Sequence, residues 1–332
     1  MQLDSVRDLK RTLNEKLLAE LPTTIRAYAA YAGASRALNL QPQQPRSVAL
    51  GVSRKGQNDF LLAVRVQHRA MQDSREVELI RKKAKGEVDV RYVGEIRKRA
   101  APWYRERNRP LRIGCSVGHY KVTAGTLGAF VRPQGADIPH ILSNNHVLAN
   151  ENRARKGDAV LQPGAYDNGQ DPKDAVAILA EVVKLKRVGA NRVDAATAKV
   201  NDGVDLEAAK LTGIGGLKGM GDVFLDEGTR VAKIGRTTGL TRGRVTAFEL
   251  DNVVVNYDIG ALRFDDQIEI EGGDKGPFSA GGDSGSLIVG QDRRAVALLF
   301  AGSDQGGSNG QGLTYGNPLP ALFAVLKIEL AL

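Results

Sequence analysis

The sequence predicts a mainly β protein in which a small N-terminal α+β domain precedes a long all-β region of barrel or sandwich type and a C-terminal helix. Three observations predict this fold class. Helical and alternating apolar patterns occur together before residue 100. From residue 110, helical periodicity gives way to frequent glycine and short apolar runs between turn residues. After Pro318 and Pro320, the run Ala321–Leu330 has the pattern of an amphipathic helix.

Composition limits the class of protein. The chain has 332 residues, 42% hydrophobic and 26% charged, which is enough for a sizeable core in two domains or one large one. No apolar run approaches the roughly 18 residues of a membrane span, and residues 1–20 lack the apolar core of a signal peptide. The single cysteine, Cys115, excludes an internal disulfide. These features predict a cytoplasmic protein that does not insert into membranes.

The N-terminal domain is assigned to residues 1–108. Its order of strand, strand, helix and strand is typical of a small α+β unit. The predicted elements, in chain order, are a helix over 4–20, a connector over 29–45, strands over 47–52 and 60–66, a helix over 75–85 and a strand over 88–96.

The same domain carries the basic excess of the chain. Residues 1–108 hold 22 Lys and Arg against 12 Asp and Glu, a net +10, whereas residues 109–332 hold 25 against 26, a net −1. One interpretation is a solvated charged face, and the other is a surface that docks an acidic partner and weakens with salt. No nucleic-acid motif accompanies the charge, which disfavours nucleic acid as the partner.

Residues 109–332 form the second predicted domain. Its roughly 220 residues exceed one small barrel and suit two. We assign the first barrel to 109–203, the second to 222–317, a glycine-rich connection to 201–221 and the C-terminal helix to 318–332. The predicted strands cover residues 121–131, 141–148, 175–183, 193–200, 231–234, 244–250, 253–257, 267–270, 286–289 and 295–301.

The stretch Phe278–Val289 holds a candidate nucleophile. Ser284 stands in a Gly-Gly-Asp-Ser-Gly sequence, and glycines permit turns that side chains forbid. Such a turn can aim the amides of Gly282 and Ser284 at one point, as an oxyanion hole requires. The hydroxyl also needs a base to become a nucleophile. Taken alone, the sequence is equally typical of an ordinary turn.

Two other stretches supply a base and an acid. His146 follows an apolar strand that begins at Ile141, and Asp194 enters a run of small residues. A carboxylate in such a run is costly to bury unless a hydrogen-bond donor meets it. An imidazole can be that donor, and the carboxylate then fixes the tautomer of the ring.

The candidate residues occur in the order His146, Asp194, Ser284, with gaps of 48 and 90 residues. Taken with the Val-Asp-Ala and Gly-Asp-Ser-Gly sequences, this order makes residues 112–330 resemble the chymotrypsin-like serine peptidases. The stretch 235–239, Gly-Arg-Thr-Thr-Gly, is similar to a hairpin of bacterial streptogrisin-like members. Two features depart from the family pattern: Ser286 replaces the usual glycine, and the usual disulfides are missing. The second points to an intracellular branch of the family.

The resemblance implies two antiparallel six-stranded barrels with a site in the cleft between them. It implies a serine endopeptidase acting on protein or peptide substrates. Ser284 would attack the peptide carbonyl, His146 would take the serine proton, and Asp194 would orient His146. The amides of Gly282 and Ser284 would bind the oxyanion. The mechanism needs no cofactor and no metal.

The resemblance also implies a substrate pocket and an activating ion pair. In this fold the base of the pocket lies six residues before the nucleophile, here at Phe278. Because no carboxylate stands there, we expect small or medium apolar side chains at the cleavage position. Asp283 needs a cationic partner, which Lys233 would supply without cleavage of the chain. The implied walls of the pocket are Ala301, Gly302, Ser303 and Gly312.

Two alternatives remain open at this point. The chain could be a peptidase-fold scaffold that binds an acidic partner through its basic N-terminal domain, or that domain could be an inhibitory pro-segment. An α/β-hydrolase is excluded, because the order of the three residues is reversed and no Gly-x-Ser-x-Gly elbow exists. The six-residue spacing of His140 and His146 matches no common metal-ligand pattern, so no metal site is predicted.

Overall fold

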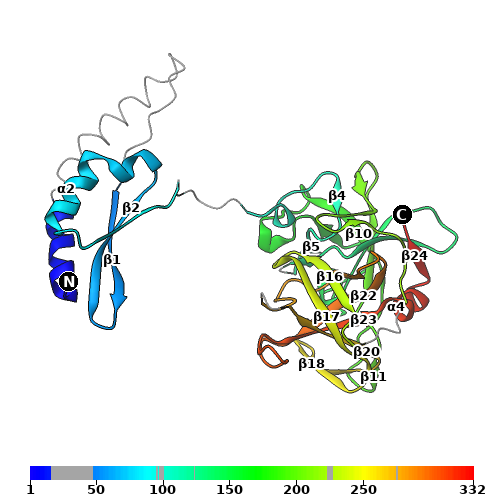
Figure 1. The fold of residues 1–332 in the computed structure, drawn as a ribbon. Coiled ribbons are helices and arrows are strands. Elements are labelled where there is room, and N and C mark those ends of the chain that lie inside the picture. The colour runs from blue at the N-terminus through cyan, green and yellow to red at the C-terminus, as the bar shows by residue number, and fades with distance from the viewer. Residues whose placement is uncertain (16–47, 95, 97–100, 123, 223–226, 274–275) are drawn as a thin grey trace, which may run out of the picture. The chain divides into compact units, whose positions relative to one another are not determined.

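A computed structural model describes the chain except for residues 16–47, 95, 97–100, 123, 223–226 and 274–275. The chain divides into two compact units, Met1–Ala100 and Ala101–Leu332 (Figure 1). Each unit has its own hydrophobic core and is described by itself.

The first unit is a three-stranded sheet covered by helices. A helix over residues 3–15 is followed by β1 (Val48–Gly56), β2 (Asp59–Val66), the 3₁₀ turn η1 (Arg69–Asp73), α2 (Arg75–Lys83) and β3 (Val88–Tyr92). The order in the sheet is β1-β2-β3, with β1 antiparallel and β3 parallel to β2. The parallel pair needs a crossover, which α2 provides. The predicted strand–strand–helix–strand order is confirmed, while the connector over 29–45 and residues 16–20 of the predicted helix lie outside the described residues.

The second unit begins with an open, eight-stranded antiparallel sheet that forms a half-barrel. Its strand order is β24-β7-β8-β12-β10-β9-β5-β6. The strands are β5 (Ser116–His119), β6 (Gly125–Thr126), β7 (Ala129–Pro133), β8 (His140–Ser143), β9 (Ala159–Leu161), β10 (Ala175–Val182), β12 (Ala196–Val200) and β24 (Ile328–Leu330). Two short elements precede these strands, η2 (Trp103–Arg105) and β4 (Leu111–Arg112). Three others lie between them, α3 (Asn145–Leu148), η3 (Ala165–Asp167) and β11 (Ala190–Asn191).

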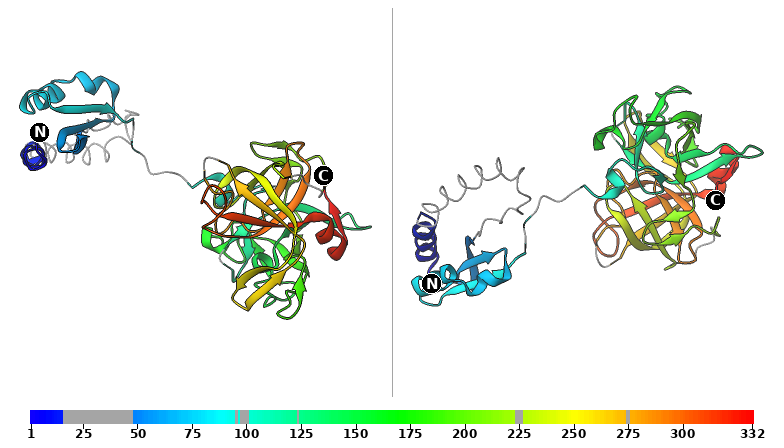
Figure 2. Two further views of the ribbon diagram at one scale, coloured as in Figure 1. Left: turned by 60° about the horizontal axis from the view of Figure 1, so that its bottom comes forward. Right: turned by 90° about the horizontal axis from the view of Figure 1, so that it is seen from above.

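The second half of this unit is a closed six-stranded barrel in the order β16-β17-β20-β23-β22-β21, drawn from yellow to red in Figures 1 and 2. The strands are β16 (Arg230–Gly235), β17 (Gly239–Leu250), β20 (Gln267–Gly272), β21 (Leu287–Gly290), β22 (Ala295–Gly302) and β23 (Leu313–Pro318). A hairpin of β18 (Val253–Tyr257) and β19 (Gly260–Phe264) leaves the barrel, and β19 pairs with β11. The predicted mainly β fold is confirmed.

Two segments differ from their predicted secondary structure. Residues 145–148, expected at the end of a strand, form the single helical turn α3. The C-terminal helix α4 (Leu319–Leu326) is shorter than expected, because Lys327 takes a left-handed conformation with φ 51° and residues 328–330 become β24. Figures 1 and 2 show this segment in red beside the first sheet, where β24 pairs with β7.

The connection over 201–221 also contains regular structure. It carries three short strands, β13 (Leu206–Glu207), β14 (Lys210–Leu211) and β15 (Gly215–Gly216). Among the described residues, no helix is long and apolar enough to cross a membrane.

Candidate active site

His146 reaches the site from the helical turn α3. Strand β8 ends at Ser143, and the turn that follows lifts the imidazole out of the sheet with 22% of its side chain exposed. Its Nδ1 lies 2.5 Å from Oδ2 of Asp194. The ring is therefore held by a carboxylate through Nδ1 and remains partly exposed, which suits a proton acceptor.

Asp194 is completely buried between β11 and β12. Its Oδ1 accepts the amides of Asn145 at 2.6 Å and His146 at 3.3 Å, and its Oδ2 accepts the imidazole and the hydroxyl of Tyr257 at 2.7 Å. Its own amide donates to Oδ1 of Asn317 on β23 at 2.9 Å. Burial of a carboxylate is tolerable when donors surround it in this way.

Ser284 lies in a turn between Phe278 and β21. Gly282 and Gly285 have φ angles of 93° and 91°, which L side chains rarely adopt. The amides of Asp283, Gly285 and Ser286 each donate to a backbone carbonyl. Those of Gly282 and Ser284 meet no acceptor among the residues that the structure describes. Two unpaired amides beside a serine hydroxyl are what an oxyanion site requires.

Strand β6 fastens the Ser284 turn to the first sheet. The amide of Thr126 donates to the Ser284 carbonyl at 2.8 Å, and its hydroxyl donates to the Gly282 carbonyl at 3.1 Å. A Cβ at Gly125 would lie 2.4 Å from the Val147 side chain and 3.0 Å from the Ser284 carbonyl oxygen. The absent side chain lets the residue that follows His146 pack close to the backbone of Ser284. The segment after His146 and the backbone of Ser284 thus meet beside Gly125.

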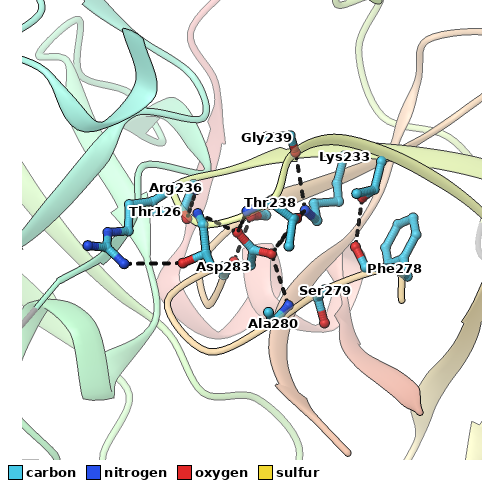
Figure 3. A network of polar contacts seen from close by, with 12 residues as sticks. Thr126, Lys233, Arg236, Thr238, Gly239, Phe278, Ser279, Ala280 and Asp283 are labelled. Atoms are coloured by element: carbon cyan, nitrogen blue, oxygen red, sulfur yellow. Dashed lines mark hydrogen bonds and ion pairs between the residues drawn. The ribbon is translucent and has the colours of Figure 1, made fainter. Parts of the chain in front are cut away.

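Lys233 and Asp283 meet in the interior of the second barrel, as Figure 3 shows. Both side chains are fully buried, and Nζ lies 3.1 Å from Oδ2. The ammonium also donates to the Thr238 hydroxyl and, at 3.2 Å, to the Gly239 carbonyl. Burial lowers the pKa of Lys233, and the Asp283 charge opposes that effect. The structure therefore brings together the two residues named as an ion pair in the sequence.

Arg236 and Asp167 form a second link behind the turn. The guanidinium donates to both carboxylate oxygens at 2.6 Å, and both side chains are 7% exposed. These hydrogen bonds raise the pKa of Arg236. Its third nitrogen donates to the hydroxyl of Thr237, which donates to the Gly281 carbonyl at 2.7 Å. The backbone ahead of Gly282 is thereby fixed from the first half of the unit.

The residues expected to line a substrate pocket divide into two groups. Phe278 is 1% exposed, and its ring packs in the barrel core with Val231, Ile270 and Leu299. Gly302 and Ser303, in contrast, are exposed. The expected pocket walls lie together: Ala301 adjoins Gly302 and Ser303 on the same segment, and a Cβ at Gly312 would lie 1.9 Å from the Ser303 carbonyl oxygen.

The remaining histidines have structural contacts. His119 lies 3.0 Å from the Asp158 carboxylate and is 1% exposed, and His140 Nδ1 lies 3.0 Å from the Ile138 carbonyl. No group of three or more His, Cys, Asp or Glu side chains within the described part of the chain is arranged to hold a metal ion.

Sequence reasoning missed Thr126, Arg236 and Tyr257. Thr126 and Tyr257 sit in strands with ordinary polar or aromatic patterns, and their partners lie 156 and 63 residues away. Arg236 is part of the hairpin sequence that was singled out, but its partner Asp167 is 69 residues earlier. The one available signal was that a buried arginine needs a carboxylate partner, which would have indicated an acidic residue near Arg236.

Comparison with known sequences gives a partial match. A family model described as the Nal1 C-terminal domain matches residues 185–314. Protein NARROW LEAF 1 of Oryza sativa subsp. japonica is 30% identical in an alignment of 206 residues, which covers 54% of this chain and 34% of that protein. The chain therefore spans about a third of the length of this relative.

Solved structures of bacterial proteases are similar over 67% of the chain. They include Thermobifida fusca Protease A (16% identity, TM-score 0.45, 99% of that chain covered) and alpha-lytic protease homolog N4 (21%, 0.46, 99%). A further one is a glutamic acid specific serine protease that uses a histidine triad in substrate binding (18% identity, TM-score 0.47, 100% of that chain covered). The fold assignment rests on the strand order given above and not on these scores.

Proposed function

We propose that the chain is a serine endopeptidase in which His146, Asp194 and Ser284 act as one unit. The observation that carries the proposal is the fully buried Asp194 carboxylate 2.5 Å from Nδ1 of a histidine whose side chain is 22% exposed. A structural protein gains little from burying a charge against a ring that remains partly exposed to solvent. The arrangement suits a base that must become an imidazolium during the reaction.

Acyl transfer to water is the reaction proposed. His146 removes the Ser284 proton, the hydroxyl oxygen attacks the peptide carbonyl, and the proton passes to the leaving amine. Water then attacks the acyl-enzyme by the same route. The unpaired amides of Gly282 and Ser284 are the groups available to hold the oxyanion. The Lys233–Asp283 pair is proposed to fix the turn that carries these amides, in the intact chain and without cleavage.

The proposed cleavage position takes small or medium apolar side chains. The buried carboxylate of Glu271 is occupied by Arg244 at 2.6 Å and by Ser308 at 2.7 Å, so it offers no charge to a basic substrate. A cation that entered the pocket would lose its water without gaining a partner. A peptide-library profile dominated by Arg or Lys would contradict this preference.

The test is labelling with a fluorophosphonate, which reacts with activated serine hydroxyls whatever the natural substrate. We expect the full chain to be labelled at Ser284. We also expect the rate of peptide hydrolysis to fall by about 10⁴-fold or more in Ser284→Ala, His146→Ala and Asp194→Asn. Ser286→Ala is the matched control, because that neighbouring hydroxyl is fully buried and donates to the Asp283 carbonyl at 2.6 Å. A folded wild-type protein that is not labelled would overturn the proposal and favour a binding role for the fold.

A further inference from the structure

Tyr257 reaches the triad from outside both sheets. It is the last residue of β18, where the hairpin turns into β19, and its hydroxyl donates to Oδ2 of Asp194 at 2.7 Å. The same oxygen lies 2.5 Å from His146 Nδ1. The tyrosine ring also stands edge-on to the imidazole, with 5.8 Å between ring centroids and 72° between planes. One phenol therefore contacts two members of the triad.

The two oxygens of the Asp194 carboxylate have different kinds of hydrogen-bond partner. Oδ1 accepts only backbone amides, those of Asn145 and His146, which fix the position of the group. Oδ2 is shared between the imidazole and the phenol. Burial and the adjacent Asp194 charge raise the pKa of Tyr257 well above its usual value, so the phenol keeps its proton and remains the donor. A donor on the same oxygen draws negative charge away from the imidazole.

The hairpin turn is fixed by the loop that follows α3. Glu151 accepts the amides of Asp258 at 3.1 Å and Ile259 at 3.0 Å, and its side chain is 13% exposed. Arg153 donates to Asp258 at 3.3 Å. The segment that carries His146 thus also holds the turn that carries the tyrosine.

The ring of Tyr257 is supported from the hairpin side as well. It stacks on Phe264 of β19 with a centroid distance of 6.0 Å, and Phe264 contacts Phe300 of β22 at 4.7 Å. Phe264 is fully buried and Phe300 is 3% exposed. Packing on both sides leaves the phenol one orientation, with its hydroxyl directed at Asp194.

We propose that Tyr257 is a positioning residue: its hydroxyl orients the Asp194 carboxylate and limits the negative charge that this carboxylate presents to His146. The contact of Glu151 with the hairpin turn holds Tyr257 in place. This inference rests on the proposed peptidase function. The titratable and charged groups that face the three side chains are Glu151 and Arg153 from the loop after α3 and Asp258 from the hairpin turn.

The experiment compares Tyr257→Phe with Tyr315→Phe in the full chain. Both variants lose one phenol hydroxyl near the same apolar cluster, but the Tyr315 hydroxyl pairs with Glu269 and not with the triad. The measured quantity is the second-order rate of fluorophosphonate labelling at Ser284 across a range of pH, together with the melting temperature.

For Tyr257→Phe we expect labelling to slow about tenfold at neutral pH, as loss of one hydrogen bond to a charged group predicts. The acid limb of the pH profile should move to higher pH, because the carboxylate then presents its whole charge to the imidazole. Tyr315→Phe should match the wild type in both respects. A Tyr257→Phe protein with the wild-type rate and acid limb overturns the inference, and a wild type that is not labelled overturns the proposed function instead.

A second variant keeps the test decisive if Tyr257→Phe is poorly folded. Glu151→Gln leaves the phenol and the triad in place and weakens only the acceptor for the hairpin amides. We expect a smaller loss in labelling rate, about threefold, with a shift of the acid limb in the same direction. A wild-type rate and profile in Glu151→Gln would overturn the proposed positioning by the hairpin.

Discussion

Replacement of Lys233 by methionine tests how the Ser284 turn is held. The change keeps an unbranched side chain of similar length and removes the ammonium that lies 3.1 Å from Asp283. Since both side chains are fully buried, the carboxylate would keep its charge without its cation. Breaking a buried pair by removing one partner typically costs about 3–5 kcal/mol of stability.

The expected loss lies at the lower end of that range. Asp283 keeps four other donors, the amides of Thr237, Thr238 and Ala280 and the hydroxyl of Thr238. Methionine also relieves the desolvation that lowers the pKa of Lys233. We therefore expect Lys233→Met to lower the free energy of unfolding by about 3 kcal/mol, and to slow labelling of Ser284 because the turn loosens.

The measurement is urea unfolding with Lys156→Met as the matched control. Lys156 pairs with Glu181 at the shorter distance of 2.6 Å, but these side chains are 67% and 58% exposed. An exposed pair contributes about 0–1 kcal/mol. If burial and not distance decides the energy, Lys233→Met must cost clearly more than Lys156→Met. Equal losses in the free energy of unfolding of the two variants would refute the reasoning. The double variant Lys233→Met/Asp283→Asn should recover part of the loss, because it removes both charges.

Two further predictions concern buried ionisable groups. The Ser308 and Arg244 hydrogen bonds lower the pKa of Glu271 from 4.5 to about 2. The stabilisation of the fold by the Glu271 carboxylate is therefore present above pH 4.5 and is lost as pH falls toward 2. The melting temperatures of wild type and Glu271→Gln should converge over that interval, and a constant difference between them would contradict this assignment. Burial raises the pKa of Cys115 to about 12, so iodoacetamide should leave the native thiol unmodified and alkylate it after unfolding. Stoichiometric alkylation of the native protein, read by mass spectrometry, would show that the site opens.

The sequence predicted the parts of the fold that depend on local patterns. Short apolar runs between turn residues predicted most strands of the closed barrel, and the turn sequence around Ser284 contains the glycines that adopt positive φ. It also named two pairs that the structure brings into contact, His146 with Asp194 and Lys233 with Asp283. The first pair was indicated by Asp194 in a run of small residues, where a buried carboxylate needs a donor. The second was implied by the resemblance to the chymotrypsin-like peptidases.

Contacts between distant strands could not be predicted in the same way. Tyr257 belongs to an alternating strand, and nothing local distinguishes it from Tyr315. Its role depends on where the whole hairpin lies, which is decided by pairing with β11 and by the packing of Phe264. Counting residues back from Ser284 also identified Phe278 without showing that its ring belongs to the barrel core. Helical pattern alone did not show that Lys327 ends α4.

The pairing of β24 with β7 has a consequence for how the protein is made. Translation delivers residues 129–133 first and residues 328–330 only after every strand of the closed barrel. Until then the edge of β7 has no neighbour on that side, and the nascent chain exposes unpaired backbone groups. The sheet that carries His146 and Asp194 is therefore completed only after Ser284 has been synthesised. A chain truncated before residue 328 would contain all three residues and still lack a finished sheet to hold two of them.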